Sequence, residues 1–416
     1  MIGIVGGGVT GLAVARFATR RGWNVHLWDD KPLSELHATW AEVTSLIAHH
    51  MDEAPDAALD FVVVSPGVPP QAAPVRAARA RGIEVVSEIE LAARHLAQPI
   101  CAITGTNGKT TVTTMVGAML EASGIERFVG GNIGKALIDA TAEAGASAAL
   151  VVEVSSYQLE AIRDFRAHVA VLLNVTEDHF DRYDSIDAYF AAKARIFERQ
   201  TADDVAILSL DDALAWSLRG AVASEVIGFG HEEVREGLFA TDREIVFRRG
   251  GREERYDLSA FKLPGAHNRE NAMAAVAAAR AMGASQEACA RVLATFEGLP
   301  HRVEFVREVR GKRYYNDSKA TNVDAVARAL ECFEAPVTLI AGGRDKGGDY
   351  GPLRRAMEGK VEHAILIGES REVMARALGG ACHIHHADSL EKAVGRAATL
   401  PCPTVLFSPA CSSFDM

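Results

Sequence analysis

The stretch that decides the fold reads Ile100-Cys-Ala-Ile-Thr-Gly105-Thr-Asn-Gly-Lys109-Thr-Thr-Val112. We expect an apolar strand over 100–103, a loop over 105–111 and a helix from about Val112. This order is typical of a phosphate-binding loop, because glycine lets backbone N–H groups at a helix N-terminus approach phosphate oxygens. Lys109 would neutralise the phosphates, and the Thr110 hydroxyl would join the shell of a Mg²⁺ ion. The predicted loop residues are Gly105, Thr106, Asn107, Gly108, Lys109, Thr110 and Thr111.

The loop departs from the full GxxxxGK[ST] pattern at one position. Ile103 stands where the pattern has its first glycine, so only Gly105 precedes Gly108. The alternative is an ordinary glycine turn that contains a lysine. The strand and the helix expected around it favour the phosphate loop.

Two acidic segments follow this loop, each at the carboxyl end of an apolar strand, which is where ligands of open α/β sheets bind. Glu153 ends the first strand, and Asn174 to Asp181 follow the second. A carboxylate beside a phosphate loop is the kind of ligand that Mg²⁺ prefers, so Glu153 is a candidate metal ligand. His179, between Asp178 and Asp181, is either a further ligand or a surface histidine.

A second glycine loop stands near the start of the chain. Gly6-x-Gly8-x-x-Gly11 follows a short apolar strand that begins at Ile2, and Asp29 closes the next strand. The spacing fits a dinucleotide-binding fingerprint, in which Asp29 would accept a hydrogen bond from a ribose or a base. These residues predict a nucleotide or pyrophosphate site and leave the nucleotide open.

The remaining pattern predicts an α/β protein with mostly parallel sheets covered on both faces. A chain of 416 residues exceeds one ordinary core, so its length predicts two or three domains, and the pattern of strands and helices divides into three. They are a Rossmann-like N-terminal domain (1–92), a central P-loop ATPase-like domain (93–297) and a C-terminal Rossmann-like domain (298–416). The predicted strands are 25–28, 61–64, 84–86, 149–153, 170–174, 313–317, 337–341, 363–367 and 405–408, and helices are expected up to Arg21 and over 271–281.

Composition excludes several classes of protein. The chain is 48% hydrophobic and 24% charged, as folded proteins are. Its net charge of -11, from 44 basic and 55 acidic residues, argues against a general role on nucleic acids or membrane surfaces. The cysteines form no CxxC pair, and we see neither a leader peptide nor a bilayer-spanning run, so a cytoplasmic protein is expected.

The remaining histidines and charge runs have simpler interpretations. His383-x-His385-His386 is expected on a strand with a solvated face rather than at a metal, and His49-His50 in a loop. The stretches 243–255 and 307–313 alternate in charge sign and predict hairpins on the solvated surface.

Taken together, several segments resemble the Mur ligase family along essentially the whole chain. They are Gly105 to Thr111, Gly130-Gly-Asn-Ile-Gly134, Glu153-Val-Ser-Ser-Tyr-Gln158, Asn174-Val-Thr-Glu-Asp-His179, Ala192-Lys-Ala-Arg-Ile-Phe197, Gly265-Ala-His-Asn268 with Asn271, Leu299-Pro-His-Arg302, Asn316-Asp-Ser-Lys-Ala-Thr-Asn322 and Ser408-Pro-Ala-Cys411. Their number and order make coincidence negligible.

The resemblance implies an ATP-dependent ligase of peptidoglycan precursor synthesis that uses Mg²⁺, and we expect a monomer. ATP would phosphorylate the alanine carboxylate of UDP-N-acetylmuramoyl-L-alanine, and the amine of D-glutamate would then displace phosphate. The first domain would hold UDP, the second ATP and the third the amino acid.

The resemblance also implies roles for individual residues. Besides the phosphate loop, ATP would contact Asn268, Asn271, Arg302 and Asp317. The UDP substrate would contact Gly8, Val9, Thr10, Gly11, Asp29, Ser65, Pro66, Gly67, Asn132, Ser155 and Gln158. Glutamate would contact Thr321, Lys346 and Ser413. The catalytic residues would be Lys109, Glu153, His179, Lys193 and Lys319.

Lys193 is expected to carry a carbamate. A free ammonium would be repelled by two Mg²⁺ ions, whereas CO₂ addition to the neutral amine makes it an anion. The metal ligands would then be Thr110, Glu153, His179 and the carbamate of Lys193. The alternative is a surface lysine on an alanine-rich helix.

Other functions remain open at this stage. The same reaction with L-glutamate is one, because enantiomers share size and charge. A folylpolyglutamate ligase shares the central motifs but lacks such a first domain. A flavin or nicotinamide oxidoreductase would leave the phosphate loop unexplained, and a nucleotide sensor would not need Lys193 and His179 together.

The printed sequence ends at Met416, soon after the 408–413 segment. Family members resembling it usually continue for roughly another helix, the length of a typical closing element. We therefore expect a third domain that lacks this helix, is mobile or open, and holds glutamate weakly.

Overall fold

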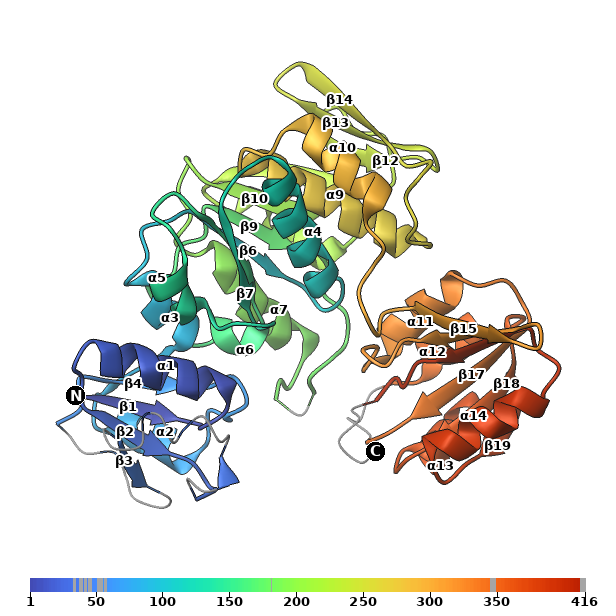
Figure 1. Ribbon diagram of the computed structural model, residues 1–416, viewed down its shortest axis with the longest axis horizontal. Helices are drawn as coiled ribbons and strands as arrows, with labels where there is room; N and C mark the ends of the chain where they lie inside the picture. The colour runs from blue at the N-terminus through green and yellow to red at the C-terminus, as the bar shows by residue number, and fades with distance from the viewer. Residues whose placement is uncertain are drawn as a thin grey trace. The chain divides into compact units, whose positions relative to one another are not determined.

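The computed structural model describes residues 1–32, 35–36, 40, 43, 47–50, 55, 58–180, 182–344 and 349–411. The chain forms two compact units. The first comprises Met1–Val175, Tyr189–Leu258 and Ala272–Leu293, and the second comprises Thr176–Ala188, Ser259–Asn271 and Ala294–Met416. The first unit contains two sheets and the second contains one, with helices between the strands (Figure 1). The predicted α/β class is confirmed.

The first sheet has the strand order β3-β2-β1-β4-β5 within the described residues, and all its pairings are parallel. Its strands are β1 (Ile2–Val5), β2 (Val25–Trp28), β3 (Ile47–His50), β4 (Phe61–Val64) and β5 (Glu84–Ser87). Its helices are α1 (Val9–Arg20), α2 (Ala73–Ala80) and α3 (Glu88–Ala93). Helix α1 buries Leu12, Val14 and Phe17, as expected of a crossover helix with one apolar face.

Strand β3 corrects the prediction that His49-His50 lie in a loop. Only Ile47 gives this segment a strand-like apolar residue, and the strand exists through its parallel pairing with β2. The ring of His50 stacks on Trp28, with the centroids 4.8 Å apart. Tertiary pairing thus overrides a weak local preference.

The second sheet has the order β14-β13-β12-β11-β10-β9-β6-β8-β7 in the part of the chain that is described. Along this order, every pairing between neighbours from β12 to β7 is parallel, whereas β12 pairs with β13, and β13 with β14, in antiparallel fashion. The strands are β6 (Ile100–Thr104), β7 (Arg127–Gly131), β8 (Ala149–Glu153), β9 (Val169–Leu172), β10 (Val205–Ser209), β11 (Glu225–Gly230), β12 (Gly237–Ala240), β13 (Glu244–Arg249) and β14 (Arg252–Asp257). The α-helices of this region are α4 (Lys109–Ala122), α5 (Ala140–Glu143), α6 (Ser156–Leu159), α7 (Ile186–Ala194), α8 (Ala213–Ser217), α9 (Ala266–Ala281) and α10 (Gln286–Thr295), with 3₁₀ turns η4 (Leu137–Asp139), η5 (Arg195–Phe197) and η6 (Leu218–Gly220).

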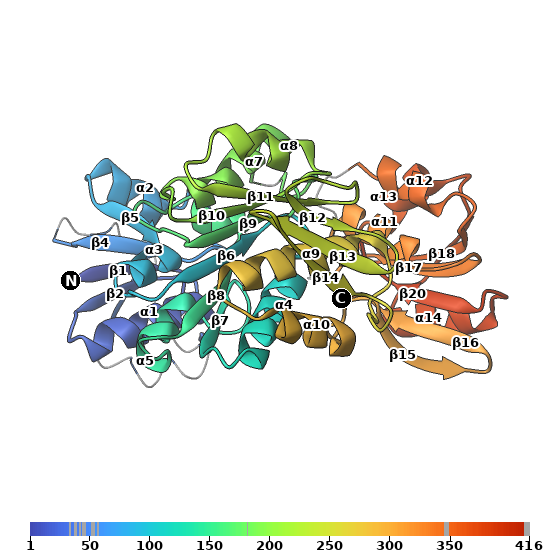
Figure 2. The same cartoon turned by 90° about the horizontal axis from the view of Figure 1, so that it is seen from above.

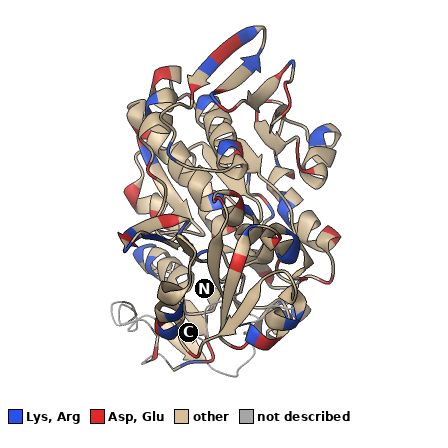
Figure 3. Cartoon of the chain, turned by 90° about the vertical axis from the view of Figure 1, so that its right-hand side faces the viewer, with Lys and Arg blue, Asp and Glu red and all other residues tan. Residues whose placement is uncertain are grey.

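The centre and the edge of this sheet differ in character. Strands β6 and β8 are buried at every residue, because parallel strands are covered on both faces. The hairpin β13–β14 is the mixed-charge stretch predicted over 243–255, and it carries arginines and acidic residues side by side (Figure 3). Arg248 pairs with Glu253 at 2.7 Å, as expected of a solvated hairpin.

The third sheet has the order β15-β16-β20-β17-β18-β19 in the described chain, with only β15 antiparallel. Its strands are β15 (Glu304–Val309), β16 (Lys312–Asn316), β17 (Val337–Gly342), β18 (Val361–Ile367), β19 (His383–His386) and β20 (Thr404–Phe407). Helices α11 (Val323–Glu331), α12 (Gly351–Met357) and α13 (Arg371–Leu378) cover one face and α14 (Leu390–Thr399) covers the other (Figure 2). The two core clusters alternate along β17, since Leu339 belongs to one and Ile340 to the other.

The histidines at the edge of this sheet lie on a strand, as predicted. His385 is half-buried, and its Nε2 lies 3.2 Å from Nδ1 of His363 on β18. The pKa of His385 is lowered by burial and by the Arg396 guanidinium. The hairpin predicted over 307–313 is the pair β15–β16.

No helix among the described residues has both the length and the apolar character needed to cross a membrane.

Candidate active site

The loop after β6 has the backbone of a phosphate-binding loop. Gly105 and Gly108 have φ of +154° and +86°, and α4 begins at Lys109. A side chain at Gly105 would meet Cβ of Leu173 at 2.9 Å, so glycine is required there. The Asn174 Oδ1 atom accepts hydrogen bonds from the backbone N–H groups of Thr106 (3.1 Å) and Asn107 (2.8 Å). Asn174 therefore fixes the shape of the loop, a role that the sequence analysis missed.

The side-chain amines of Lys109 and Lys193 both donate hydrogen bonds to the carbonyl oxygen of Gly105. Lys109 Nζ donates to the carbonyl of Gly105 (2.9 Å) and to that of Thr106 (2.8 Å). Lys193 Nζ donates to the same Gly105 carbonyl (2.8 Å) from α7. Lys193 is only 1% exposed, and its Nζ lies 4.4 Å from the ring centroid of Tyr189. The structure thus places both predicted lysines at the phosphate loop, and the surface alternative for Lys193 is wrong.

A carboxylate and two polar side chains gather beside the amines. Glu153, at the end of β8 and 2% exposed, accepts a hydrogen bond from Thr110 Oγ1 (2.8 Å) and another from Asn132 Nδ2 (3.0 Å). Hydroxyl and carboxylate oxygens at one point are the hard ligands that suit Mg²⁺. Ser155 and Gln158 follow Glu153 and cap α6 in a reciprocal capping box.

The first glycine loop is held by contacts within its own sheet. Asp29 Oδ2 accepts a hydrogen bond from the Gly7 N–H (2.6 Å), and the Trp40 indole donates to the Gly7 carbonyl (2.8 Å). Ser65 Oγ donates to the Gly6 carbonyl (2.9 Å). A side chain at Gly11 would meet that same Gly6 oxygen at 2.1 Å. Asp29 and Ser65, both predicted to contact the UDP substrate, thus adjoin the loop, and Trp40 adjoins it as well, which the sequence analysis missed.

His179 belongs to the second unit, as do Asn322 and Lys319. The Asp178 carboxylate accepts hydrogen bonds from the backbone N–H of His179 (2.8 Å) and from Asn322 Nδ2 (3.1 Å). His179 has φ of +60°, a conformation that few non-glycine residues adopt. The acidic segment after β9 is therefore tied to the 316–322 segment that the sequence analysis singled out.

Asp317, a predicted ATP ligand, is buried and accepts two hydrogen bonds. It is 5% exposed, and it accepts hydrogen bonds from Ser408 Oγ (2.6 Å) and the Val303 N–H (3.1 Å). Burial raises its pKa to about 6, although both donors and Arg302 oppose the shift. The contact of Ser408 with Asp317 joins two segments of the family resemblance that stand far apart in sequence.

A hollow of about 1040 Å³ in the second unit is lined by Asn268 and Arg302 together with Tyr315 and Phe333. Asn268 Nδ2 donates to the Pro264 carbonyl (2.7 Å), which orients its amide at the start of α9. Asn268 and Arg302 thus line one hollow, as a shared ligand would require. Of the predicted glutamate ligands, Thr321 follows Asp317 along the chain, whereas Lys346 and Ser413 lie outside the described residues.

Parallel sheets with a lysine-bearing phosphate loop and an adjoining carboxylate define an α/β nucleotide-binding enzyme. Comparison with known families makes this more specific. The Mur ligase MurD-like N-terminal domain matches residues 1–87, the Mur ligase middle domain residues 103–279 and the Mur ligase glutamate ligase domain residues 301–411. The chain belongs to the Mur ligase family.

Relatives and solved structures agree with this membership. The UDP-N-acetylmuramoylalanine–D-glutamate ligase of Geobacter metallireducens is 49% identical over 420 residues, which cover 99% of this chain and 93% of that protein. That of Trichlorobacter lovleyi is 47% identical, with 99% and 94% covered. MurC of Thermotoga maritima, at 19% identity, has the same fold, with a TM-score of 0.62 over 99% of this chain and 96% of that one. MurF of the same organism, solved with ADP, gives 0.62 at 16% identity over 93% and 91%.

Proposed function

We propose that this chain joins D-glutamate to UDP-N-acetylmuramoyl-L-alanine at the expense of ATP, in the synthesis of peptidoglycan precursors. The relatives that carry this name align over nearly the whole chain, at 49% identity for Geobacter metallireducens. The observation in the structure that best supports it is the convergence of Lys109, Lys193 and the Thr110–Glu153 pair on one phosphate loop.

The reaction needs positioning and charge neutralisation more than covalent chemistry by the protein. An oxygen of the alanine carboxylate attacks the γ-phosphorus of ATP, and ADP leaves. The glutamate amine then attacks the acyl carbon, loses a proton, and inorganic phosphate departs with the C–O bond electrons. Lys109 would exchange the carbonyls of Gly105 and Thr106 for phosphate oxygens, whose charge an ammonium stabilises better.

The residues present fit a magnesium ion. Thr110 Oγ1 and Glu153 Oε2 are 2.8 Å apart, and Glu153 is buried, so its charge needs a cation or strong donors nearby. Bound Mg²⁺ would supply charge neutralisation on the phosphate oxygens. We assign Thr110, Glu153 and His179 as ligands, with two ions expected.

Lys193 is proposed as the fourth ligand, in carbamate form. The ammonium would first lose a proton, and the neutral amine would then add to CO₂ and release a second proton, so that a carbamate anion replaces a buried cation. The nearby ammonium of Lys109, which shares the Gly105 carbonyl with it, would stabilise that anion.

The remaining ligands are proposed by domain. Residues 1–92 would bind UDP through Gly8, Val9, Thr10, Gly11, Asp29 and Ser65 to Gly67, with Asn132, Ser155 and Gln158 completing the substrate site. Residues 93–297 would bind ATP, helped by Arg302 and Asp317, and residues 298–416 would bind glutamate through Thr321, Lys346 and Ser413, with Lys319 catalytic. We expect a cytoplasmic monomer.

A coupled phosphate-release assay tests the proposal. With UDP-N-acetylmuramoyl-L-alanine and ATP, D-glutamate should support turnover and L-glutamate should not. Turnover with L-glutamate but not with D-glutamate would show that L-glutamate is the substrate. No turnover with either enantiomer would overturn the proposed reaction.

A further inference from the structure

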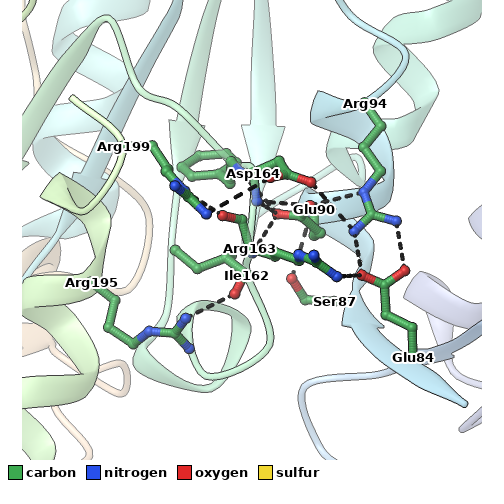
Figure 4. Close-up of polar contacts among 10 residues, drawn as sticks. Glu84, Ser87, Glu90, Arg94, Ile162, Arg163, Asp164, Arg195 and Arg199 are labelled. Atoms are coloured by element: carbon green, nitrogen blue, oxygen red, sulfur yellow. Dashed lines mark hydrogen bonds and ion pairs between the residues drawn. The ribbon is translucent and has the colours of Figure 1, made fainter. Parts of the chain in front are cut away.

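The segment from Leu159, the last residue of α6, to Phe165 is called the α6–β9 loop here. Side chains from other elements form hydrogen bonds with both its backbone N–H groups and its carbonyls. The loop leads from α6, which carries the Ser155–Gln158 capping box, toward β9. Its N–H groups bind a side chain from α3, the helix that follows the first sheet. Its carbonyls accept hydrogen bonds from the side chain of Arg195, two residues after Lys193. Figure 4 shows the two sets of contacts meeting at this loop.

Glu90 of α3 holds the N–H edge. Its side chain is fully buried, and its carboxylate accepts hydrogen bonds from the backbone N–H groups of Arg163 (2.8 Å), Asp164 (3.0 Å) and Phe165 (2.9 Å). Arg94, one turn further along α3, donates to the same carboxylate at 2.9 Å. A buried charge with four donors is stable, whereas three amides deprived of it would each remain unsatisfied.

The first sheet adds a direct backbone contact to this grip. The Ser87 N–H, at the end of β5, donates to the Ala161 carbonyl at 2.9 Å. Ser87 Oγ also accepts a hydrogen bond from the Glu90 N–H and so caps α3. Strand β5 and the Glu90 carboxylate, which Ser87 connects, therefore both bind the loop.

Arg195 holds the carbonyl edge. Its Nη1 donates to the carbonyls of Leu159 (2.8 Å) and Glu160 (2.7 Å), and its Nη2 donates to that of Ile162 (2.8 Å). One rigid guanidinium thus binds three carbonyls within four residues of the loop. Lys193, two residues earlier, is bound to the phosphate loop.

The ion pairs around Glu90 and the loop lie at the surface. Glu84 pairs with Arg94 at 2.8 Å and with Arg163 at 3.4 Å, and these side chains are partly or largely exposed. Arg199 lies 3.9 Å from Asp164, both exposed. Exposed pairs contribute little, so Glu90 and Arg195 carry the connection.

We propose that Glu90 and Arg195 are positioning residues that, through the α6–β9 loop, set the first sheet and its substrate loop at a fixed distance from Lys193. The role rests on the proposed function, because only a reaction between groups held by both regions depends on that distance. Neither residue is among the proposed substrate ligands. Binding of each substrate alone should survive their loss, whereas turnover should fall, because a displacement of about 1 Å can cost on the order of 10²-fold in rate.

Glu90→Gln and Arg195→Met test the proposal in the full chain. Each should lower kcat by roughly 10- to 100-fold, with the KM for ATP and that for the UDP substrate changed by less than about 3-fold. Arg195→Lys, which keeps a cation but donates to fewer carbonyls, should recover part of the loss. The double variant should lose little more than the worse single one, since both act through one loop.

Asp204→Asn is the matched control for a purely structural effect. Asp204 is also a buried carboxylate, bound to Arg166 (2.8 Å) and to the Thr201 N–H (2.7 Å), in the same unit. It should lower the Tm with kcat kept, whereas Glu90→Gln should lower kcat at temperatures where it is folded. If Glu90→Gln does not fold, Arg195→Met decides alone.

The outcomes separate the two proposals. Inactive wild-type enzyme would overturn the proposed ligation. Active wild type with kcat of Arg195→Met within about 2-fold, or with an equal loss in Asp204→Asn, would overturn the positioning role alone.

Discussion

The first unit contains two glycine loops, one after β1 and one after β6, that have the same strand–loop–helix arrangement but differ in the charged side chains around them. Both follow a parallel strand and open a helix, β1 to α1 and β6 to α4. In the first, the Asp29 carboxylate binds the loop's own N–H at Gly7 (2.6 Å). In the second, the ammonium groups of Lys109 and Lys193 bind the loop's carbonyl at Gly105. If both loops bind nucleotides as proposed, the glycines would let the nucleotide approach, and the side chains from neighbouring elements would select the part of it that is bound.

Replacing Lys109 by alanine should give the largest effect. Loss of the only ammonium on the loop itself should lower kcat on the order of 10³-fold, because charge develops on the transferred phosphoryl group. The Tm should be nearly unchanged. Phosphate-release kinetics check this, with Lys135→Ala as the control for an exposed lysine that pairs with Glu143. Near-normal turnover would remove the distinction between the two loops.

Replacing Lys193 by alanine should come next, with a loss on the order of 10²-fold that a short carboxylic acid restores in part. The acid would supply the anion that the proposed carbamate would provide, in the cavity that the side chain leaves. Activity is measured with and without acetate, and Lys109→Ala serves as the control that acetate should not rescue. Absence of rescue, with unmodified lysine in a structure containing ATP and Mg²⁺, would contradict the carbamate.

The sequence predicted strands best where they are buried and apolar. β2, β4 and β8 match residue for residue, because parallel strands inside a sheet are largely apolar, with only His26 in β2 and the terminal Glu153 in β8 as exceptions. β3 was missed, since its histidines form a strand only through β2. Likewise, the proximity of Thr110 and Glu153 followed from two strand ends, whereas Trp40 at Gly7 and Glu90 at residues 163–165 depend on contacts that no local pattern reveals.

Glu88 gives a pH-dependent test of how the first sheet joins the second. It is buried on α3, and its Oε1 accepts a hydrogen bond from the Ile138 N–H at 2.6 Å. Burial raises its pKa from 4.5 to about 7, against the effect of that N–H. The folded state thus keeps a proton that the unfolded state releases, so the free energy of unfolding should fall as pH rises from about 4.5 to about 7.

Glu88→Gln removes this titration. Relative to wild type, its free energy of unfolding should rise between pH 4.5 and pH 8 by an amount on the order of 3 kcal/mol. Urea denaturation at the two pH values measures this, with Glu121→Gln as the control for loss of an exposed carboxylate. An equal pH dependence in wild type and Glu88→Gln would show that the side chain titrates normally.

The smallest effect is expected at the first loop, from Asp29→Asn. The amide keeps the size of the side chain but loses the charge that orients the Gly7 N–H, and its NH₂ group is a poor match for the N–H groups of Gly7 and Lys31. The KM for the UDP substrate should rise about 10-fold, while kcat and the KM for ATP stay within about 2-fold. This is the reverse of the pattern expected for Lys109→Ala, because in the proposed function the first loop would bind a part of the substrate that does not react. Asp30→Asn, at the exposed neighbouring position, is the control and should change neither constant. A fall in kcat at unchanged KM for Asp29→Asn would mean that the two loops do not divide binding and chemistry between them.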